Sequence, residues 1–174
     1  MQPEGSDRDH TIRAIVVALS IGAIWAGVCL ITSRKKIAKK KVFISFDFAI
    51  DLKYKNLLSA WAANDRFDFD IEVTSPSVAI DSTAAGTIKT ALTKKLQDAE
   101  ILLVIVGKET AKSPWITWEI DRAKMADIKL PLVGVKIDQS YTSPTGLLKA
   151  GTEWAMSFTR DSIVKALDSA KAAY

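Results

Sequence analysis

Composition restricts the side chains that are available for chemistry. The single cysteine, Cys29, lies in an apolar segment, and the single histidine, His10, lies in the polar N-terminal tail. The chain from residue 42 onward therefore has no disulfide, no Cys/His zinc site and no histidine-based catalytic triad. Catalysis there would have to use carboxylates, hydroxyls, lysines, tyrosines or backbone groups, and we expect no metal and no bound cofactor.

One carboxylate interrupts an apolar helical pattern. The spacing i, i+3, i+4, i+7 of a buried helical stripe is formed by Ile116, Glu119, Ile120 and Ala123. Glu119 also lies between Trp115 and Trp118, so its carboxylate should be partly desolvated and should cost stability unless it is satisfied. Two interpretations are open: a structural glutamate that caps backbone amides or pairs with Arg122, or a functional carboxylate.

The elements that must position Glu119 follow from hydrophobic periodicity. Strands are predicted at residues 42–46, 69–73, 101–106, 132–137 and, more weakly, 153–158. Helices are predicted at residues 52–63, 84–98, 114–127 and 161–173. This alternation predicts an α/β fold, a flavodoxin-like five-stranded parallel sheet of order 2-1-3-4-5 with helices on both faces. The run ILLVIV at 101–106 should be its central strand.

The predicted strand order also predicts where a ligand binds. Strands 1 and 3 are neighbours and the chain reverses direction between them, so ligands should bind at loops 46–51 and 107–114. A flavin-binding protein needs a Ser/Thr/Gly-rich phosphate loop after strand 1, where this chain has the bulky, acidic sequence FDFAID. A phosphoacceptor receiver domain needs an aspartate at the end of strand 3, where this chain has Gly107 and Lys108. Both functions are disfavoured.

An uncharged, mostly apolar run, AIVVALSIGAIWAGVCLI, precedes this domain at residues 14–31. At ~1.5 Å per residue it spans roughly 27 Å, close to the ~30 Å hydrocarbon core of a bilayer. A cleaved signal peptide carries its positive charge before the apolar run, whereas six basic residues follow this one. We therefore predict a short extracytoplasmic tail (1–13), a transmembrane helix (14–32), a basic juxtamembrane linker (33–41) and a domain (42–174).

The charge distribution predicts the orientation of the chain and excludes one class of partner. The six basic residues are Arg34, Lys35, Lys36, Lys39, Lys40 and Lys41. The positive-inside rule predicts a single-pass protein of the cell (inner) membrane, with its N-terminus outside and its domain in the cytoplasm. The basic run can also contact anionic membrane lipids. Without these six, 18 of the 24 Lys and Arg remain against 20 Asp and Glu, so no nucleic-acid-binding face is expected.

Three motifs resemble a TIR (Toll/interleukin-1 receptor) domain. They are VFISFD at the first strand, IVGKET after the third strand and SPWITWEI at the start of the next helix. The combination of SFD, YKNLLSAW and VGKET followed by SPWITWEI is most similar to the TIR-like (ThsB-type) proteins of the bacterial Thoeris anti-phage defence system. The resemblance covers residues 41–138. Its most specific part is 115–119, which has the W-x-x-x-E spacing of bacterial TIR domains.

The resemblance implies an activity and a set of site residues. Many TIR domains cleave NAD at the nicotinamide–ribose bond, and Thoeris-type domains are similar in making cyclised ADP-ribose signals for a downstream effector. The family's catalytic glutamate corresponds to Glu119 and its helix tryptophan to Trp115. Phe46 and Asp47, after the first strand, would line the nucleotide pocket. Segment 74–83 corresponds to the family's variable loop, which often mediates self-association.

The residue inventory agrees with this chemistry. The nicotinamide of NAD is already cationic and leaves as a neutral molecule, so one carboxylate that fixes the ribose hydroxyls can suffice. We therefore predict a membrane-anchored antiviral NAD glycohydrolase or ADP-ribosyl cyclase, with NAD as substrate. One alternative is a non-enzymatic TIR-like interaction module at the membrane, because FDFAID replaces the family's usual basic or small residues. Another is an anchor that itself acts on the membrane.

Overall fold

The computed structural model describes residues 39–64, 69–73 and 79–171, and a parallel sheet of five strands runs through them. The strands are β1 (Lys40–Ser45), β2 (Phe69–Val73), β3 (Ile101–Val106), β4 (Leu132–Lys136) and β5 (Glu153–Ala155). Their spatial order is β2-β1-β3-β4-β5, and every neighbouring pair is parallel. The predicted flavodoxin-like strand order is confirmed.

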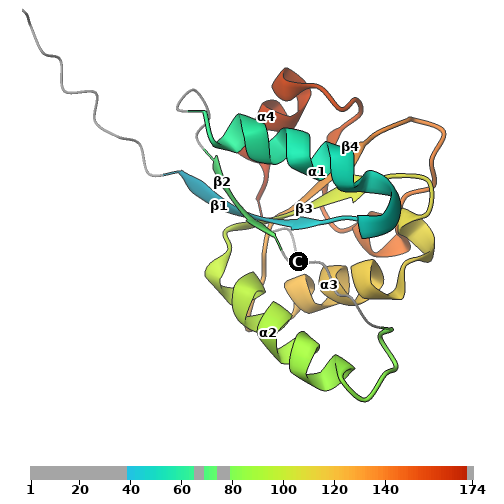
Figure 1. Cartoon of the computed structure of the whole chain (residues 1–174). Helices are drawn as coiled ribbons and strands as arrows, with labels where there is room; N and C mark the ends of the chain where they lie inside the picture. Colours follow the sequence, from blue (N-terminus) through green and yellow to red (C-terminus); the bar gives the residue numbers. More distant parts are fainter. Residues whose placement is uncertain (1–38, 65–68, 74–78, 172–174) are drawn as a thin grey trace, which may run out of the picture. The chain divides into compact units, whose positions relative to one another are not determined.

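Helices cover both faces of the sheet, as predicted. They are α1 (Phe48–Ala62), α2 (Ala85–Asp98), α3 (Pro114–Lys124) and α4 (Arg160–Ser169), with short 3-10 helices η1 (Thr110–Lys112) and η2 (Thr145–Leu147). Figure 1 shows α1 and α4 on one face and α2 and α3 on the other. Right-handed crossovers between parallel strands produce this arrangement.

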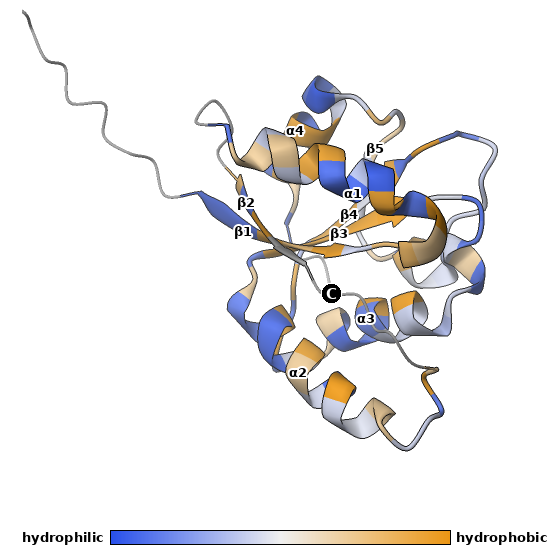
Figure 2. Ribbon diagram, in the orientation of Figure 1, coloured by the Kyte–Doolittle hydropathy of each residue, from blue (hydrophilic) through white to orange (hydrophobic). Residues whose placement is uncertain are grey.

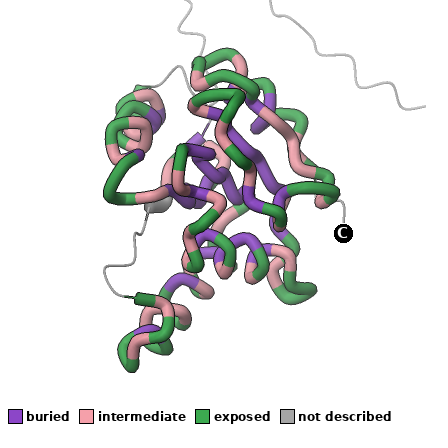
Figure 3. Tube along the Cα trace, turned by 90° about the vertical axis from the view of Figure 1, so that its right-hand side faces the viewer, coloured by how far each residue is buried: buried purple, intermediate pink, exposed green. Residues whose placement is uncertain are grey.

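β3 separates two hydrophobic cores, one on each face of the sheet. Ile101, Leu103 and Ile105 pack in the core that contains residues of α1 and α4. Leu102, Val104 and Val106 pack in the core that contains residues of α2 and α3. All six are buried, and Figure 2 shows β3 and β4 in hydrophobic colours. In Figure 3 the central strands are buried, whereas the helices alternate between buried and exposed residues. The prediction of a central strand at Ile101–Val106 is confirmed.

Two side-chain caps place helix N-termini at the carboxyl edge of the sheet. The Ser113 Oγ accepts a hydrogen bond from the Ile116 N–H at 3.4 Å, and Pro114 begins α3, as predicted. The Asp47 Oδ1 accepts from the Ala49 N–H at 2.9 Å and caps α1. This aspartate cap explains why α1 begins at Phe48, four residues before the predicted start. Both helices therefore point their N-termini toward the predicted ligand-binding edge.

The start of β1 includes residues that the sequence assigned to the basic linker. The strand begins at Lys40, two residues before the predicted start. The Lys39 Nζ donates to the carbonyl of Ala62 at 2.6 Å, at the end of α1. The Lys40 Nζ donates to the Leu167 carbonyl and lies 2.9 Å from Asp168, in the last turn of α4. These ammonium groups interact favourably with the negative ends of two helix dipoles.

The C-terminal segment completes the core on the α1 and α4 face. The Phe158 ring lies 4.8 Å from the Tyr54 ring and 6.0 Å from the Trp61 ring, centroid to centroid. Because Tyr54 and Trp61 are seven residues apart on α1, they lie on the same face of that helix. β5 is shorter than the predicted strand, since it ends at Ala155.

Part of the sequence prediction lies outside the described residues. This is true of the tail at 1–13, the transmembrane helix at 14–32, most of the linker and residues 74–78 of the loop after β2. Within the described ranges, no helix combines the length and the apolar character that crossing a bilayer requires.

Candidate active site

A buried carboxyl and a buried hydroxyl meet near the carboxyl end of β1. Glu119, on the sheet-facing side of α3, is 3% exposed, and Ser45, the last residue of β1, is 1% exposed. The Ser45 Oγ donates a hydrogen bond to the Glu119 Oε2 at 2.5 Å. Ile116, Ile120 and Ala123 are buried on the same side of α3, so the predicted stripe is confirmed with the glutamate inside it. This pair lies beside the β1/β3 switch point, where ligands of this architecture bind.

The environment of Glu119 favours its neutral form. Burial raises the pKa of Glu119 from 4.5 to about 8, and the hydrogen bond from Ser45 opposes that rise. At pH 7 the group is therefore mainly protonated in this conformation. Perturbed carboxyl groups of this kind concentrate at functional sites, although structural networks also produce them.

The structural alternative of a Glu119–Arg122 pair is wrong. The Arg122 guanidinium forms two hydrogen bonds with the Asp127 carboxylate, at 2.8 and 2.5 Å. Its Nε also donates to the Thr93 Oγ1 at 3.3 Å. Arg122 is therefore oriented toward α2 and the end of α3, and Ser45 takes the place of the expected arginine partner.

Of the predicted pocket residues, Trp115 lies on the helix of Glu119 and Phe46 lies on the other face of the sheet. Trp115 is half-buried and packs edge-on against Trp118, with 6.0 Å between ring centroids and 83° between ring planes. Phe46 is buried in the core shared by α1 and α4. Asp47 lies at the carboxyl edge as the cap of α1. The structure therefore places Glu119 beside Ser45, the residue before Phe46.

A second buried carboxyl lies at the same edge of the sheet. Asp51, in the first turn of α1, is 3% exposed, and its Oδ2 has no hydrogen-bond partner. Burial, followed by the charge of Asp47, raises the pKa of Asp51 to about 6, whereas Lys53 lowers it. An added Cβ at Gly107 would lie 2.1 Å from the Asp51 Oδ2, so the glycine allows this close packing. Gly107 and Phe46 share the α1 face, opposite Glu119.

Two other buried polar side chains hold loops at the carboxyl edge. The Thr110 Oγ1 accepts from the Gly107 N–H at 2.8 Å and donates to the Ile105 carbonyl at 3.1 Å. The Lys136 Nζ, at the end of β4, donates to the carbonyls of Gln139 and Tyr141. Both residues satisfy backbone groups and fix loop geometry, so we assign them structural roles.

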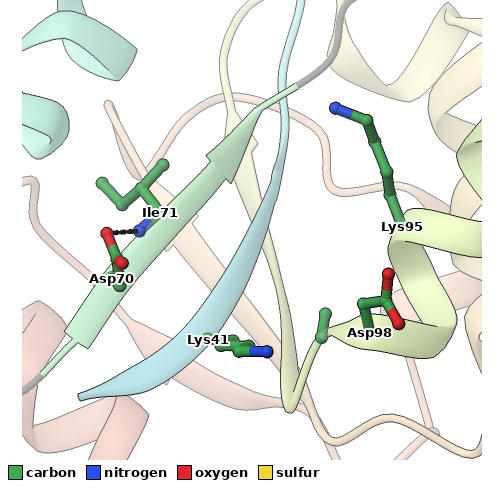
Figure 4. Close-up of a pocket in the computed structure, with 6 residues that line it drawn as sticks. Lys41, Asp70, Ile71, Lys95 and Asp98 are labelled. Atoms are coloured by element: carbon green, nitrogen blue, oxygen red, sulfur yellow. Dashed lines mark hydrogen bonds between the residues drawn. The ribbon is translucent and has the colours of Figure 1, made fainter.

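A cavity of about 360 Å³ lies at the opposite, amino end of the sheet. Figure 4 shows its labelled lining residues, which come from β1, β2 and the end of α2: Lys41, Asp70, Ile71, Lys95 and Asp98. Two lysines and two aspartates give this lining no net charge. Since parallel α/β sheets bind ligands at their carboxyl ends, the cavity does not replace the Glu119 region as the candidate site.

Sequence reasoning identified Glu119 but missed its partner. Ser45 is the one polar residue in the apolar run VFISF, and this was the available signal. Asp51 and Thr110 lie in the two loops expected to bind a ligand, but their burial gave no sequence signal. Among the described residues no group of three or more His, Cys, Asp or Glu could hold a metal ion.

Glu119→Gln is expected to change how stability depends on pH. The folded protein keeps the Glu119 proton up to pH of about 8, whereas the unfolded chain releases it near pH 4.5. This contribution to stability is fully present below pH of about 4.5 and is lost as the pH rises through about 8. Glutamine stays neutral, so the variant should match the wild type near pH 4, below the pKa of the unfolded chain. At pH 9 it should exceed the wild type by on the order of a few kcal/mol. Thermal unfolding of the full-length protein in detergent measures this difference, and parallel pH profiles for the two proteins would contradict it.

The fold and the buried pair define a class of protein: a flavodoxin-like α/β domain with a desolvated carboxyl beside its topological switch point. A family model described as "Thoeris protein ThsB, TIR-like domain" matches residues 43–142, which is more than half of the chain. The chain therefore belongs to the ThsB TIR-like family. The match begins inside β1, includes Ser45 and Glu119, and ends before η2, β5 and α4.

Comparisons with other proteins add a structural likeness. No curated protein matches the sequence. Fourteen chains of solved structures match. One belongs to the structure of the activated Roq1 resistosome directly recognizing the pathogen effector XopQ, in its TIR domains. That match has 17% sequence identity and a TM-score of 0.41, and it covers 59% of this chain and 61% of the other. The alignment thus spans less than two thirds of that chain's length.

Proposed function

We propose that this protein is a membrane-anchored bacterial TIR-like defence protein that cleaves NAD and makes an ADP-ribose-type, cyclic signal. Membership of the ThsB TIR-like family supports a role in defence signalling. The observation that carries the enzymatic part is the position of Glu119, a buried carboxyl beside the β1/β3 switch point. Further copies of the chain, anionic membrane lipids and an effector that responds to the nucleotide signal are its proposed partners.

One carboxylate fits the chemistry of NAD cleavage. The bond between the ribose C1′ and the nicotinamide nitrogen breaks, and its electron pair neutralises the pyridinium ring. An oxocarbenium-like ribose remains, and a carboxylate that binds the ribose hydroxyls stabilises that charge. Attack by water gives ADP-ribose, whereas attack by a nitrogen of the same molecule's adenine gives a cyclic product. In this scheme Glu119 is the catalytic residue, and Trp115 and Asp47 contact the nucleotide.

The substrate itself would promote ionisation of Glu119. In the free protein the carboxyl is mainly neutral at pH 7, because its pKa is about 8. A cationic nicotinamide that enters the site favours the carboxylate, since an opposite charge within ~4–6 Å lowers the pKa of an acid. The Glu119 carboxyl is therefore mainly neutral in the free protein and ionises when NAD binds. Its activity should also increase with pH between about 6 and 8.

We assign the apolar segment at 14–32 the role of an anchor in the cell membrane, with the domain in the cytoplasm. Anchoring confines all copies to one plane, and this raises their effective concentration for one another. Confinement would promote self-association of the domains. The loop after β2 is the proposed contact, following the family's variable loop.

The decisive experiment is NAD turnover by the full-length protein in liposomes. We expect release of free nicotinamide together with an ADP-ribose-type product, at a rate that increases with protein density in the membrane. Chromatography and mass spectrometry identify both products. Glu119→Gln in the same liposomes controls for contaminating activity. Unchanged NAD at high protein density would contradict the enzymatic proposal.

A second candidate function is that of a non-enzymatic interaction module. Two observations favour it: Glu119 is nearly inaccessible, and Phe48 and Ile50 are exposed at the start of α1. These two side chains lie two residues apart in the first turn of α1, and contiguous exposed apolar patches often mark protein contacts. For such a module we expect density-dependent cross-linking in liposomes with NAD unchanged. Replacing Phe48 and Ile50 by serine should reduce that cross-linking. Loss of NAD in the same liposomes would instead favour the enzymatic proposal.

A further inference from the structure

Ser45 occupies a position that an apolar side chain would ordinarily fill. Along β1, Val42 and Ile44 pack in the core with α1, whereas Phe43 packs in the core with α2 and α3. Ser45, two residues after Phe43, faces that second core, as strand alternation requires. Its backbone lies opposite Val104 of β3. A hydroxyl at such a position is unfavourable unless it is hydrogen-bonded.

The bond to Glu119 satisfies that hydroxyl and restricts the carboxyl. Ser45 ends an inner strand of the sheet. It pairs with Val104 of β3, and the preceding residue, Ile44, pairs with Val73 of β2, so the backbone position of Ser45 is fixed. Its Oγ donates to the Oε2 of Glu119 at 2.5 Å. The other carboxyl oxygen, Oε1, is then the one that remains for a substrate hydroxyl. Among the hydrogen bonds described for this chain, only the Ser45–Glu119 bond joins two buried side chains.

The described surroundings of the pair contain no charge that acts on Glu119. β3 is apolar along its whole length, from Ile101 to Val106. On α3, Arg122 is paired with Asp127, and at η1, Lys112 is paired with Glu109. Among the described residues, only burial and Ser45 affect the pKa of Glu119. Removing the hydroxyl should therefore act on Glu119 alone.

We propose that Ser45 is a positioning residue for Glu119: its hydroxyl orients the carboxyl toward the substrate and stabilises the ionised form that cleavage requires. This inference rests on the proposed NAD-cleaving function, and it assigns a role to a residue of β1 rather than of the loop after it. Ser45 acts through Glu119 and need not touch NAD. No covalent step involves the serine, because it keeps its proton and donates it only in a hydrogen bond.

Three substitutions separate the hydroxyl from the volume of the side chain. Ser45→Ala removes the donor, Ser45→Cys keeps the size with a much weaker donor, and Ser45→Thr keeps the hydroxyl. Each is measured as the full-length protein in liposomes, for kcat and KM with NAD between pH 6 and 9. We expect alanine and cysteine to lower kcat at pH 7 about 10-fold, with KM changed less than about threefold. The rising limb of their kcat profiles should move upward by about half a pH unit or more, and threonine should stay near the wild type.

A measurement that needs no activity accompanies these rates. The pH dependence of thermal stability reports the ionisation of Glu119 directly. If Ser45 stabilises the ionised form, the loss of stability with rising pH should extend to higher pH in Ser45→Ala and Ser45→Cys than in the wild type. This test remains valid even if NAD proves not to be the substrate, so failure of the proposed function and failure of the Ser45 role are distinguishable.

Two results would overturn the Ser45 role. One is that Ser45→Ala and Ser45→Cys both keep the wild-type midpoint in the dependence of kcat on pH. The other is that the stability of both variants depends on pH in the same way as that of the wild type. A shifted midpoint in both variants supports the role even if Ser45→Thr does not fold, because alanine and cysteine lose the hydroxyl with opposite small changes in side-chain volume.

Discussion

Glu119→Gln should reduce NAD cleavage by the full-length protein at least 100-fold. Glutamine keeps the size of the side chain, and its amide oxygen can still accept the Ser45 hydrogen bond. It cannot become an anion, so it loses the electrostatic stabilisation of an oxocarbenium-like ribose. Removal of one such preorganised group typically costs 10²–10³-fold in rate. The measurement is nicotinamide release in liposomes, over a range of NAD concentrations that separates kcat from KM.

Asp121→Asn provides a matched control on the same helix. Asp121 is exposed and lies 3.0 Å from the Lys124 Nζ, on the outer side of α3. A surface pair of this kind contributes little to stability, so the control should retain activity within about twofold of the wild type. If Glu119→Gln and Asp121→Asn have equal rates, Glu119 is not the catalytic residue, although the protein remains an enzyme. If both lose activity together, the loss reflects damage to α3.

Gly107→Ala should strongly destabilise the fold. An alanine Cβ at this position would lie 2.1 Å from the Asp51 Oδ2 and 2.6 Å from its Cγ. Neither group can move easily, because Gly107 directly follows the central strand and Asp51 is buried in the first turn of α1. Overpacking of a buried site typically costs about 1–3 kcal/mol, which corresponds to a decrease in Tm of roughly 5–10 °C for a domain of this size.

Asp51→Ala tests whether the aspartate causes that loss. The double variant Gly107→Ala/Asp51→Ala should recover part of the stability lost in Gly107→Ala, because the clashing carboxyl is absent. The two substitutions should therefore be clearly non-additive, as expected for residues in contact. Gly86→Ala is the matched control, since its added Cβ would meet nothing within 4 Å. Because Gly86 lies inside α2, alanine there should leave Tm unchanged or raise it slightly. Additive effects at Gly107 and Asp51 would contradict the contact.

These two predictions concern opposite faces of the sheet, at the same carboxyl edge. Glu119 lies on the α3 face with Ser45, whereas Asp51 lies on the α1 face with Gly107. Both carboxyls are buried and both have raised pKa values. Among the described residues, Glu119 has a hydrogen-bond donor that can stabilise its anion, whereas the Asp51 Oδ2 has none. This difference is the physical reason for assigning catalysis to Glu119 and packing to Asp51.

The sequence by itself determined the sheet and the location of the key acid. Apolar runs of strand length alternate with helical stripes, and the right-handed crossover rule then leaves few strand orders, so β2-β1-β3-β4-β5 was predictable. Glu119 was predictable because burial of its helical stripe depends on local spacing alone. Helix ends were less accurate: the Asp47 cap starts α1 four residues early, and α3 ends at Lys124 rather than near 127.

Only the tertiary structure decided which groups meet at the carboxyl edge. Ser45 and Glu119 are 74 positions apart in the sequence, and their bond depends on which face of β1 receives α3. Because side chains alternate along a strand, that choice turns Ser45 toward the glutamate and places Phe46, a predicted pocket residue, in the opposite core. The contact of Asp51 with Gly107 depends likewise on how α1 packs against the end of β3. Sequence periodicity shows that a residue is buried, whereas the packing of helices on the sheet determines its partner.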